Sequence, residues 1–375
     1  MVSVYSLIHF IVDFSCAILM YRFVAGTPAG YLCFLLYNFF AFAMQMPLGI
    51  LADKLNRNSL VAMAGCVLVA ISFGLAQIPV AATIIIGTGN ALFHLGGGID
   101  VLNISEEKLG ALGVFVSPGA FGVFYGTMLG GGSGFPVIVI PAALLASAGL
   151  IFAAHKAQRG AYPKNAALSL SGLGSGRALA AIACLFLVVC LRSFAGLALN
   201  FSWKGVGFWG TALICAVVFG KTIGGLAADR FGLRRTAVVS LGVAALLFLL
   251  PGAPIAGVSA LLLFNMTMPI TLWALAKLIP GAKGFAFGIL TFGLFLGYLP
   301  VYLGANVSQA ANLLFALLAA ASLGILLLGL WKAVPRKPGE LECESDESGP
   351  KSGEPLEDGL CAARPQRRGT RGEQL

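Results

Sequence analysis

Charge is scarce in this sequence. Only 10% of its 375 residues are charged, whereas 58% are hydrophobic and the mean hydropathy is +0.92. A soluble globular domain carries about 25% charged residues, so the composition excludes that class and indicates a polytopic membrane protein in a lipid bilayer. The net charge of +9 does not indicate binding to nucleic acid, because the basic residues fall mainly in short loops between apolar runs.

Motifs for catalysis and metal binding are also lacking. The eight cysteines form no Cys-x-x-Cys pair and no Cys/His metal spacing, so we interpret them as small buried hydrophobes and expect no metal site. No nucleophile–base pair is evident, which argues against an enzyme. No Gly-x-x-x-x-Gly-Lys-Ser/Thr loop is present, which argues against a pump driven by ATP. We therefore expect no cofactor.

Long apolar runs take the place of those motifs. A membrane span needs about 20 mostly apolar residues, and such runs must be helical because lipid offers no partner to backbone polar groups. The sequence therefore predicts an all-α membrane protein with about twelve transmembrane helices in two pseudo-symmetric bundles of six. The predicted spans are 4–23, 29–51, 59–77, 80–102, 109–129, 135–154, 178–200, 206–227, 236–250, 255–278, 285–303 and 308–331.

The loops predict the domain organisation and the orientation. Residues 1–154 form the first bundle, 155–177 a polar linker, 178–332 the second bundle and 333–375 a disordered polar tail. Most loop lysines and arginines fall on one side of the membrane, and only Arg22 and Lys204 fall on the other. The basic side is cytoplasmic by the positive-inside rule, so both termini are expected in the cytoplasm. The first run carries His9 and Asp13 and is interpreted as a span of the inner or plasma membrane, not as a cleavable signal peptide.

One loop occurs twice, about half the chain apart. Gly224-Gly-Leu-Ala-Ala-Asp229-Arg230-Phe-Gly232-Leu-Arg234-Arg235 has an upstream counterpart in Gly49-Ile-Leu-Ala-Asp53-Lys54-Leu-Asn56-Arg57-Asn58. Asn56 replaces the turn glycine, and asparagine tolerates the left-handed conformation. Such repeats are typical of secondary transporters whose halves rock about a central site. We expect the gate to include Asp53, Arg57, Asp100, Asp229, Arg230, Arg234 and Arg235.

Asp13 is the most informative ionisable residue within a span. A charge at the bilayer centre costs roughly 2.5–3.5 kcal/mol, and Asp13 lies near the middle of the first helix. His9 lies four residues earlier and therefore on the same helical face. The sequence predicts that Asp13 and His9 form a proton-coupling site. The alternative is a buried pair that only tethers the first helix to a neighbour.

Three further ionisable residues lie within predicted spans. Arg192 keeps its charge and needs an anionic partner, either Asp13 or an anionic substrate, although a structural ion pair between the halves is the alternative. His94 is either a site residue or a hydrogen-bonded structural histidine. Lys221 either lines the cavity or extends to the cytoplasmic surface. In addition, Asp100 is expected to pair with the bases of the Asp53–Arg57 loop.

Small residues give a separate packing prediction. Gly122, Gly126 and Gly130 recur at intervals of four in the fifth predicted span, a spacing that lets two helices approach closely. Pro118 is expected to kink the same helix.

The duplicated loop resembles the signature of the major facilitator superfamily. Further stretches resemble its fosmidomycin-resistance branch of drug-efflux transporters: His9-Phe-x-x-Asp13-Phe, Ala91-Leu-Phe-His94, Leu191-Arg192-Ser193, and Met268-Pro269-x-Thr271 leading to Leu278-Ile-Pro280-Gly281. After His94, however, this chain has Leu-Gly-Gly-Gly where the branch tends to have Pro-Glu. The resemblance implies alternating access, proton-driven export, and a substrate path that includes Asp13, His94, Arg192, Asn265 and Trp273, with Asn38, Gln45, Tyr125 and Tyr298 as secondary candidates.

The sequence therefore predicts a secondary transporter, expected to be monomeric, that exports a small molecule or drug by proton-coupled antiport. The molecule is expected to be anionic or amphipathic, and the cavity is expected to contain Arg192, His94, Lys221, Asn265 and Trp273. One alternative is proton-coupled uptake of a nutrient or metabolite. Another is a membrane sensor that does not transport and signals through the tail.

Overall fold

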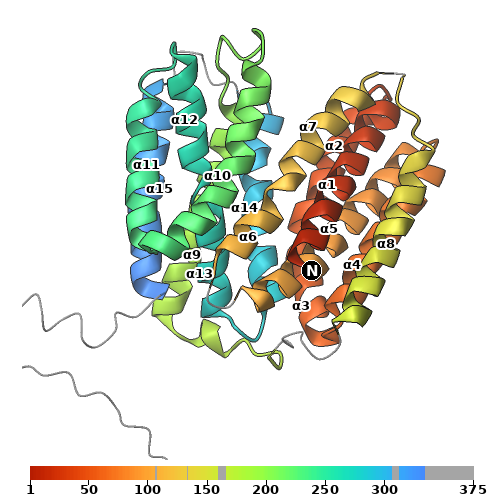
Figure 1. The fold of residues 1–375 in the computed structure, drawn as a ribbon, viewed down its shortest axis with the longest axis horizontal. Helices are drawn as coiled ribbons and strands as arrows, with labels where there is room; N and C mark the ends of the chain where they lie inside the picture. The colour runs from red at the N-terminus through yellow and green to blue at the C-terminus, as the bar shows by residue number, and fades with distance from the viewer. Residues whose placement is uncertain (106–107, 133, 159–165, 306–311, 334–375) are drawn as a thin grey trace, which may run out of the picture. The chain divides into compact units, whose positions relative to one another are not determined.

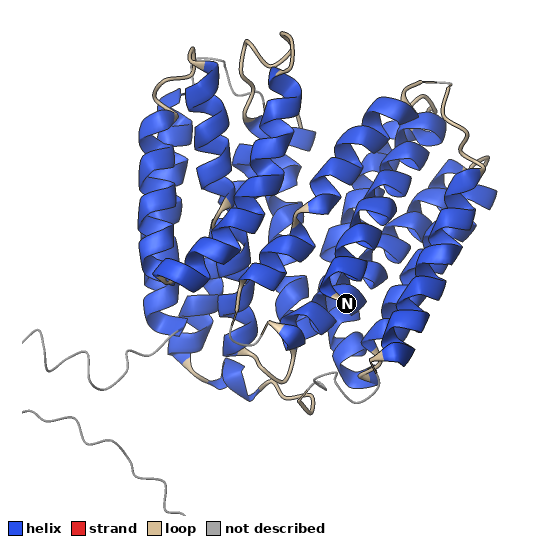
Figure 2. Ribbon diagram, viewed as in Figure 1, coloured by secondary structure: helices blue, strands red, loops and turns tan. Residues whose placement is uncertain are grey.

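The structure is a computed structural model that describes residues 1–105, 108–132, 134–158, 166–305 and 312–333, and in these ranges its regular elements are all helices (Figure 2). The loop bases Arg159 and Lys164 and the predicted tail from residue 334 onward lie outside the described residues.

Within the described residues, the first half contains six helical segments (Figure 1). Three of them consist of more than one piece, because a π-helical stretch or a break interrupts the regular α-helix. The six segments are α1 (Val2–Leu19, extended by Met20–Val24), α2 (Gly30–Asn38) continuing through Phe39–Ala43 into α3 (Gln45–Leu55), α4 (Asn58–Gly74), α5 (Pro79–Ile104), α6 (Gly110–Val116) followed by α7 (Pro118–Gly130), and α8 (Val139–Ala157).

The second half also contains six segments. They are α9 (Gly176–Ala198), α10 (Trp209–Phe231), α11 (Leu233–Leu247), α12 (Pro254–Asn265) followed by α13 (Met268–Leu278), α14 (Lys283–Tyr302) and α15 (Asn312–Ala333). These twelve segments confirm the predicted fold class. Ten are long and apolar enough to cross a membrane, and the other two, α4 and α11, are shorter at 17 and 15 residues. The chain is therefore a multi-pass membrane protein.

Proline and turn residues account for the helix ends that the sequence singled out. The fifth segment breaks at Ser117, directly before Pro118, as expected for a residue that lacks a backbone N–H. Asn56 ends α3 with φ of 48°, and Gly232 separates α10 from α11 with φ of 87°. Both turns of the duplicated loop therefore use a positive φ, as the two sequences predicted.

Glycines allow close helix contacts both within the first half and between the two halves. In α7, a methyl group on Gly122, Gly126 or Gly130 would collide with α1, so the predicted small-residue face lets these two helices pack backbone to backbone. Between the halves, α3 packs on α14, and a methyl group on Gly49 would collide with the backbone at Gly284. On the opposite side, α6 packs on α10, where Gly225 lies against Leu109.

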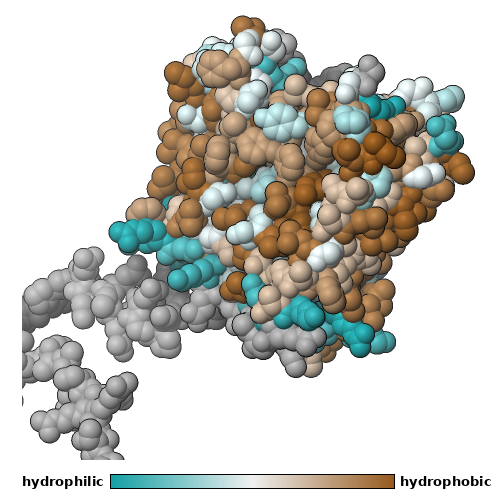
Figure 3. Space-filling view, turned by 45° about the vertical axis from the view of Figure 1, so that its right-hand side comes forward, coloured by the Kyte–Doolittle hydropathy of each residue, from teal (hydrophilic) through white to brown (hydrophobic). Residues whose placement is uncertain are grey.

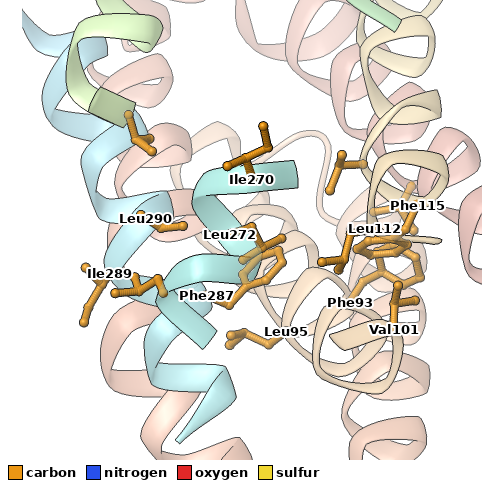
Figure 4. Packing of buried hydrophobic residues seen from close by; sticks show 14 of the residues in the cluster. Phe93, Leu95, Val101, Leu112, Phe115, Ile270, Leu272, Phe287, Ile289 and Leu290 are labelled. Carbon is orange, nitrogen blue, oxygen red and sulfur yellow. The ribbon is translucent and has the colours of Figure 1, made fainter. Parts of the chain in front are cut away.

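A hydrophobic layer fills the space between the halves near the duplicated loops. Figure 4 shows side chains of α13 and α14, including Leu272 and Phe287, close to Leu95 of α5. Phe287 is buried, and its ring occupies the space where a side chain on Gly98 would lie. The face of the protein in Figure 3 is mainly hydrophobic across its middle, as expected for a surface in contact with lipid.

Candidate functional site

A cavity of about 460 Å³ lies between the two halves, with lining residues from the middle of helices, such as Asp13 and Lys221, to near their ends, such as Tyr21 and Tyr298. Its walls come from α1, the extended α2, α7, α9, α10, α12, α13 and α14, and most of the lining is apolar or aromatic. Four polar residues singled out from the sequence line it: Asp13, Arg192, Lys221 and Asn265. Two of the secondary candidates, Asn38 and Tyr298, also line the cavity, together with Tyr21, Phe34 and Tyr37, which the sequence analysis did not select.

Arg192 of α9 lines this cavity and is only 8% exposed. One guanidinium nitrogen, Nη2, donates a hydrogen bond of 3.4 Å to the hydroxyl of Thr271 on α13. The other, Nη1, is buried and has no partner among the described residues. Because a buried charge without a counter-charge is costly, this guanidinium requires an anion that the described part of the chain does not supply.

Lys221 provides a second cation in the same cavity. It lies on α10, and its Nζ donates a 3.2 Å hydrogen bond to the carbonyl of Val116, at the end of α6 where the helix breaks before Pro118. Of the two positions that the sequence left open for Lys221, the structure shows the cavity position and not the surface one. The cavity is therefore lined by two cations and one carboxylate.

Asp13 does not pair with Arg192 in this structure. Its carboxylate instead contacts two histidines: Oδ2 lies 3.2 Å from Nε2 of His9, and Oδ1 lies 3.7 Å from Nε2 of His94. His9 is one helical turn before Asp13 on α1, whereas His94 comes from α5. Both imidazoles are buried behind Asp13, which is the member of this cluster that lines the cavity. We call His9, Asp13 and His94 the histidine–aspartate cluster.

The two imidazole rings contact each other directly. Their Nε2 atoms are 2.8 Å apart, and the ring planes are perpendicular. Nδ1 of His9 lies 2.7 Å from the carbonyl oxygen of Phe115, and Nδ1 of His94 lies 2.9 Å from that of Asn90. Each ring is thus fixed at Nδ1 by the main chain, and each Nε2 is directed at the other ring.

Neighbouring residues hold this arrangement in place. The Asn90 side-chain amide donates a 2.8 Å hydrogen bond to Oδ1 of Asp13, and Asn90 is one turn before His94 on the same face of α5. Gly119 of α7 leaves the space that His9 and Asp13 occupy, because any side chain there would collide with both. Neither Asn90 nor Gly119 was predicted from the sequence. Asn90 could have been found, because it precedes His94 by four residues, the same spacing as that of His9 and Asp13.

The histidine–aspartate cluster is also the one group in the described residues that brings three metal-ligand side chains together. Two nitrogens on one tetrahedral zinc, each about 2.0–2.1 Å from the metal, would lie roughly 3.3 Å apart. The observed 2.8 Å is a hydrogen-bond distance. The geometry thus fits a shared hydrogen better than a shared metal ion.

The acids of the duplicated loop bridge the halves with matching geometry. Asp53 accepts hydrogen bonds of 2.8 and 2.9 Å from the backbone N–H groups of Gly284 and Phe285, at the start of α14. Asp229 accepts bonds of 2.6 and 2.8 Å from those of Leu109 and Gly110, at the start of α6. Each carboxylate therefore caps a helix of the opposite half, where the helix dipole favours negative charge.

The other expected gate residues behave differently. Asp100 does not pair with the bases of the neighbouring loop, and that expectation was wrong: it accepts hydrogen bonds from Tyr5 at 2.6 Å, Asn58 at 2.8 Å and Ser59 at 3.5 Å. Neutral donors from α1 and α4 satisfy this buried carboxylate, so it joins helices of one half. Four loop arginines make no side-chain hydrogen bond or ion pair within the described residues: Arg57, Arg230, Arg234 and Arg235.

Some candidates lie away from the cavity. Trp273 of α13 lines a separate pocket with Lys277 and Lys283, nearer the duplicated loops, because it lies beyond the break between α12 and α13. His94 is behind Asp13 and does not line the cavity. Gln45 is buried with its amide on the carbonyl of Ala41, and Tyr125 is partly exposed on α7.

A contact between the halves was missed at the end opposite the duplicated loops. Tyr31 and Tyr302 stack at 4.3 Å, and each hydroxyl donates a hydrogen bond to the other residue's carbonyl, at 3.0 and 2.9 Å. Isolated tyrosines at helix ends gave no sequence signal for it.

Comparison with known proteins identifies the fold. No protein-family model and no curated protein sequence matches the chain. Among solved structures, a variant of the E. coli fucose:proton symporter FucP is similar with a TM-score of 0.64 and 15% identity, over 89% of this chain and 98% of that chain. FucP in the outward conformation, described as a major facilitator superfamily transporter, has a TM-score of 0.58 and 16% identity, over 88% of this chain and 100% of that chain. The human organic anion transporter MFSD10 (TETRAN) has a TM-score of 0.60 and 16% identity, over 87% of this chain and 98% of that chain. At these identities the likeness shows that the chain has the major facilitator fold.

Proposed function

We propose that this protein is a secondary active transporter of the major facilitator superfamily that moves a small organic anion across the membrane by alternating access. The observation that carries this proposal is the buried Nη1 of Arg192, a residue that lines the mainly apolar cavity: this nitrogen has no partner among the described residues. A substrate carboxylate, phosphate or sulfonate would supply the missing counter-charge, and Lys221 provides a second positive charge in the same cavity.

The contacts between the halves support alternating access. At the end that carries the duplicated loops, Asp53 and Asp229 tie each half to a helix of the other, and the hydrophobic layer around Phe287 lies between that end and the cavity. If this end is cytoplasmic, as the loop charges predict, the structure represents a state closed to the cytoplasm. Transport would then require both helix caps to break and the opposite end, where the Tyr31–Tyr302 contact lies, to close further.

Asp13 and His9 are proposed as the proton-coupling site, as the sequence predicted. Asp13 lines the cavity that holds the cations, so its charge acts on any bound anion. A proton taken up by the cluster neutralises one negative charge, and that charge then no longer repels an anionic substrate. Proton and anion then each favour the binding of the other, and this reciprocal linkage is that of a symporter.

The second candidate is export by antiport, possible on the same fold and favoured by the sequence motifs shared with the fosmidomycin-resistance branch. Antiport requires proton and substrate to compete, which suits a substrate that bonds to the ionised Asp13 directly. A cationic or amphipathic drug could do so, with the aromatic lining of Tyr21, Phe34 and Tyr298 receiving its apolar part.

The test is uptake by proteoliposomes of a labelled panel of organic anions, organic cations and neutral metabolites, with and without an imposed pH gradient. The proposal expects an organic anion to accumulate, and expects both a protonophore and Asp13→Asn to abolish accumulation driven by the gradient. Retention of wild-type accumulation in Asp13→Asn would exclude Asp13 from coupling. Movement of cations but not anions would replace the symport proposal with the antiport candidate.

A further inference from the structure

The hydrogen bonds of the two buried histidines determine where their ring hydrogens lie. Nδ1 of His9 faces the carbonyl oxygen of Phe115, and Nδ1 of His94 faces that of Asn90. A carbonyl oxygen can only accept a hydrogen bond, so each Nδ1 must carry a hydrogen and donate it. A neutral imidazole with its hydrogen on Nδ1 has a bare lone pair on Nε2.

Two bare lone pairs would therefore face each other across the 2.8 Å between the Nε2 atoms. That contact is repulsive unless one Nε2 also carries a hydrogen, which makes that ring an imidazolium. A protonated Asp13 does not remove the conflict, because its hydroxyl hydrogen lies on the carboxyl group and not on the line between the rings. The geometry needs one proton between His9 and His94.

We propose that His9 and His94 share a single proton between their Nε2 atoms, that Asp13 is its counter-ion, and that this imidazole pair carries the coupling proton. This proposal rests on the proposed transport function for its role and on the hydrogen-bond geometry for its existence. It assigns to His94, which does not line the cavity, a role equal to that of His9. Asp13 becomes the group that links the pair to the cavity.

The surrounding charges fit this assignment. From α1, Asp13 contributes a negative charge 3.2 Å from Nε2 of His9, and from α10, the cation Lys221 lines the same cavity as Asp13. The neighbouring atoms of α5 and α6 are neutral, being the Asn90 side chain and the carbonyl of Phe115. With one shared proton the histidine–aspartate cluster is neutral overall, whereas without it the cluster carries one negative charge in the cavity that Lys221 and Arg192 also line.

Proton loss would then move the helices. The proton passes from Nε2 of His9 to Oδ2 of Asp13 and from there to water in the cavity, and both imidazoles remain neutral with their lone pairs facing. Each ring is fixed at Nδ1 to the main chain, so the repulsion acts on α1 and α5 as well as on the side chains. Release of the proton therefore favours a conformation in which these two helices are displaced from one another.

The chain allows a direct measurement because it contains only three histidines. We suggest solid-state NMR of the full-length protein in lipid bilayers, labelled with ¹⁵N-histidine and prepared with a chelator. The third histidine, His155 of α8, bonds to Ser59 and is assigned by His155→Gln. The expected spectrum shows two protonated Nδ1 atoms and a coupling through the hydrogen bond between the two Nε2 nuclei.

Other spectra would overturn the proposal. Two uncoupled Nε2 atoms, or a hydrogen on Nε2 with a bare Nδ1 in either ring, would exclude the shared proton. Absence of the coupling in the chelator-treated sample, with both Nε2 signals shifting when zinc is added, would identify a metal site instead. These readouts need no substrate, so they remain decisive if the proposed transport function fails.

A transport experiment then tests the role of the pair. His94→Gln keeps hydrogen-bonding atoms but cannot hold a proton, and His155→Gln is the matched control outside the cluster. With an anion shown to be carried, His94→Gln is expected to retain exchange of labelled for unlabelled substrate and to lose accumulation driven by a pH gradient. The control should retain both. Gradient-driven accumulation at the wild-type level in His94→Gln would overturn the coupling role, and if this variant does not fold, the NMR result decides the shared proton.

Discussion

The sharpest consequence of the structure concerns the substitution Arg192→Met. If Arg192 binds the substrate, methionine removes the counter-charge of a bound anion while filling much of the same space. A hydrogen bond to a charged group contributes about 1.5–3 kcal/mol. Since about 1.4 kcal/mol corresponds to a tenfold change in affinity, the loss of one such bond should weaken substrate binding roughly 10- to 150-fold.

The same substitution should not destabilise the folded protein. Nη1 of Arg192 has no partner among the described residues, and its one side-chain hydrogen bond, to Thr271, is long at 3.4 Å. Replacing a buried charge that lacks a counter-charge by an apolar side chain is neutral or stabilising. A structural ion pair would behave oppositely, because removing one partner of such a pair costs about 3–5 kcal/mol.

Two assays on one variant therefore separate the two roles of Arg192. Thermal unfolding in detergent should give an unchanged or higher Tm for Arg192→Met, and transport assays should give a raised KM. The control is Arg22→Met, which removes an arginine of the first segment that donates to the carbonyls of Phe135 and Leu129, outside the cavity. This control should keep the wild-type KM. A marked fall in Tm with unchanged KM for Arg192→Met would refute the substrate role.

Three further predictions concern the gate, the α1–α7 contact and the tail. The double substitution Asp53→Asn and Asp229→Asn removes two charge–dipole interactions of about 0.3–2 kcal/mol each. It should increase the fraction of molecules that are open at the end bearing the duplicated loops, as measured by spin-label distances across that end. An unchanged distance distribution would contradict a gate at these residues. Gly126→Leu should lower the free energy of unfolding by about 1–3 kcal/mol through overpacking, and so lower the Tm. The control Gly149→Leu on α8, where the glycine faces open space, should not. Equal Tm values for the two variants would show that the close α1–α7 approach is not required. Deletion of residues 340–375 should leave substrate flux unchanged in proteoliposomes. Absence of flux in the full-length protein, with a cellular response that the deletion abolishes, would support the sensor alternative.

Hydrophobic periodicity predicted the fold well because lipid leaves few alternatives for long apolar runs. The twelve predicted spans correspond to the twelve observed segments, and the duplicated loop indicated their internal symmetry. Length alone could not define α4 and α11, which are shorter than the about 20 residues expected of a span. The turn residues Asn56 and Gly232 were predicted correctly because positive φ restricts the choice of residue.

The site was harder to predict because partners on different helices have no sequence signature. The sequence identified Asp13, His9, His94 and Arg192 as costly in the membrane but left open which of them meet. In the structure the first three lie together, whereas Arg192 lines the cavity and does not pair with Asp13. Trp273 was misplaced for a local reason, since the break between α12 and α13 lies before it.

The hydrogen-bond partners of the gate acids could not be predicted from hydrophobic periodicity. Asp53 and Asp229 were expected in a gate among bases, yet each caps a helix start with main-chain donors. Main-chain N–H groups are present at every helix start, so residue type could not single out these two. Only the packing of α3 on α14 and of α6 on α10 brings acid and helix start together.

The most direct test of the central claim is the direction of proton movement when the substrate crosses the membrane. Proteoliposomes containing a pH-sensitive dye and no imposed gradient are mixed with an external organic anion identified from the panel. We expect the lumen to acidify as the anion enters, Asp13→Asn to abolish the signal, and Arg192→Met to shift the signal to higher anion concentrations. Lumen alkalinisation on anion entry, or entry with no pH change, would contradict the coupling of anion and proton at this cavity.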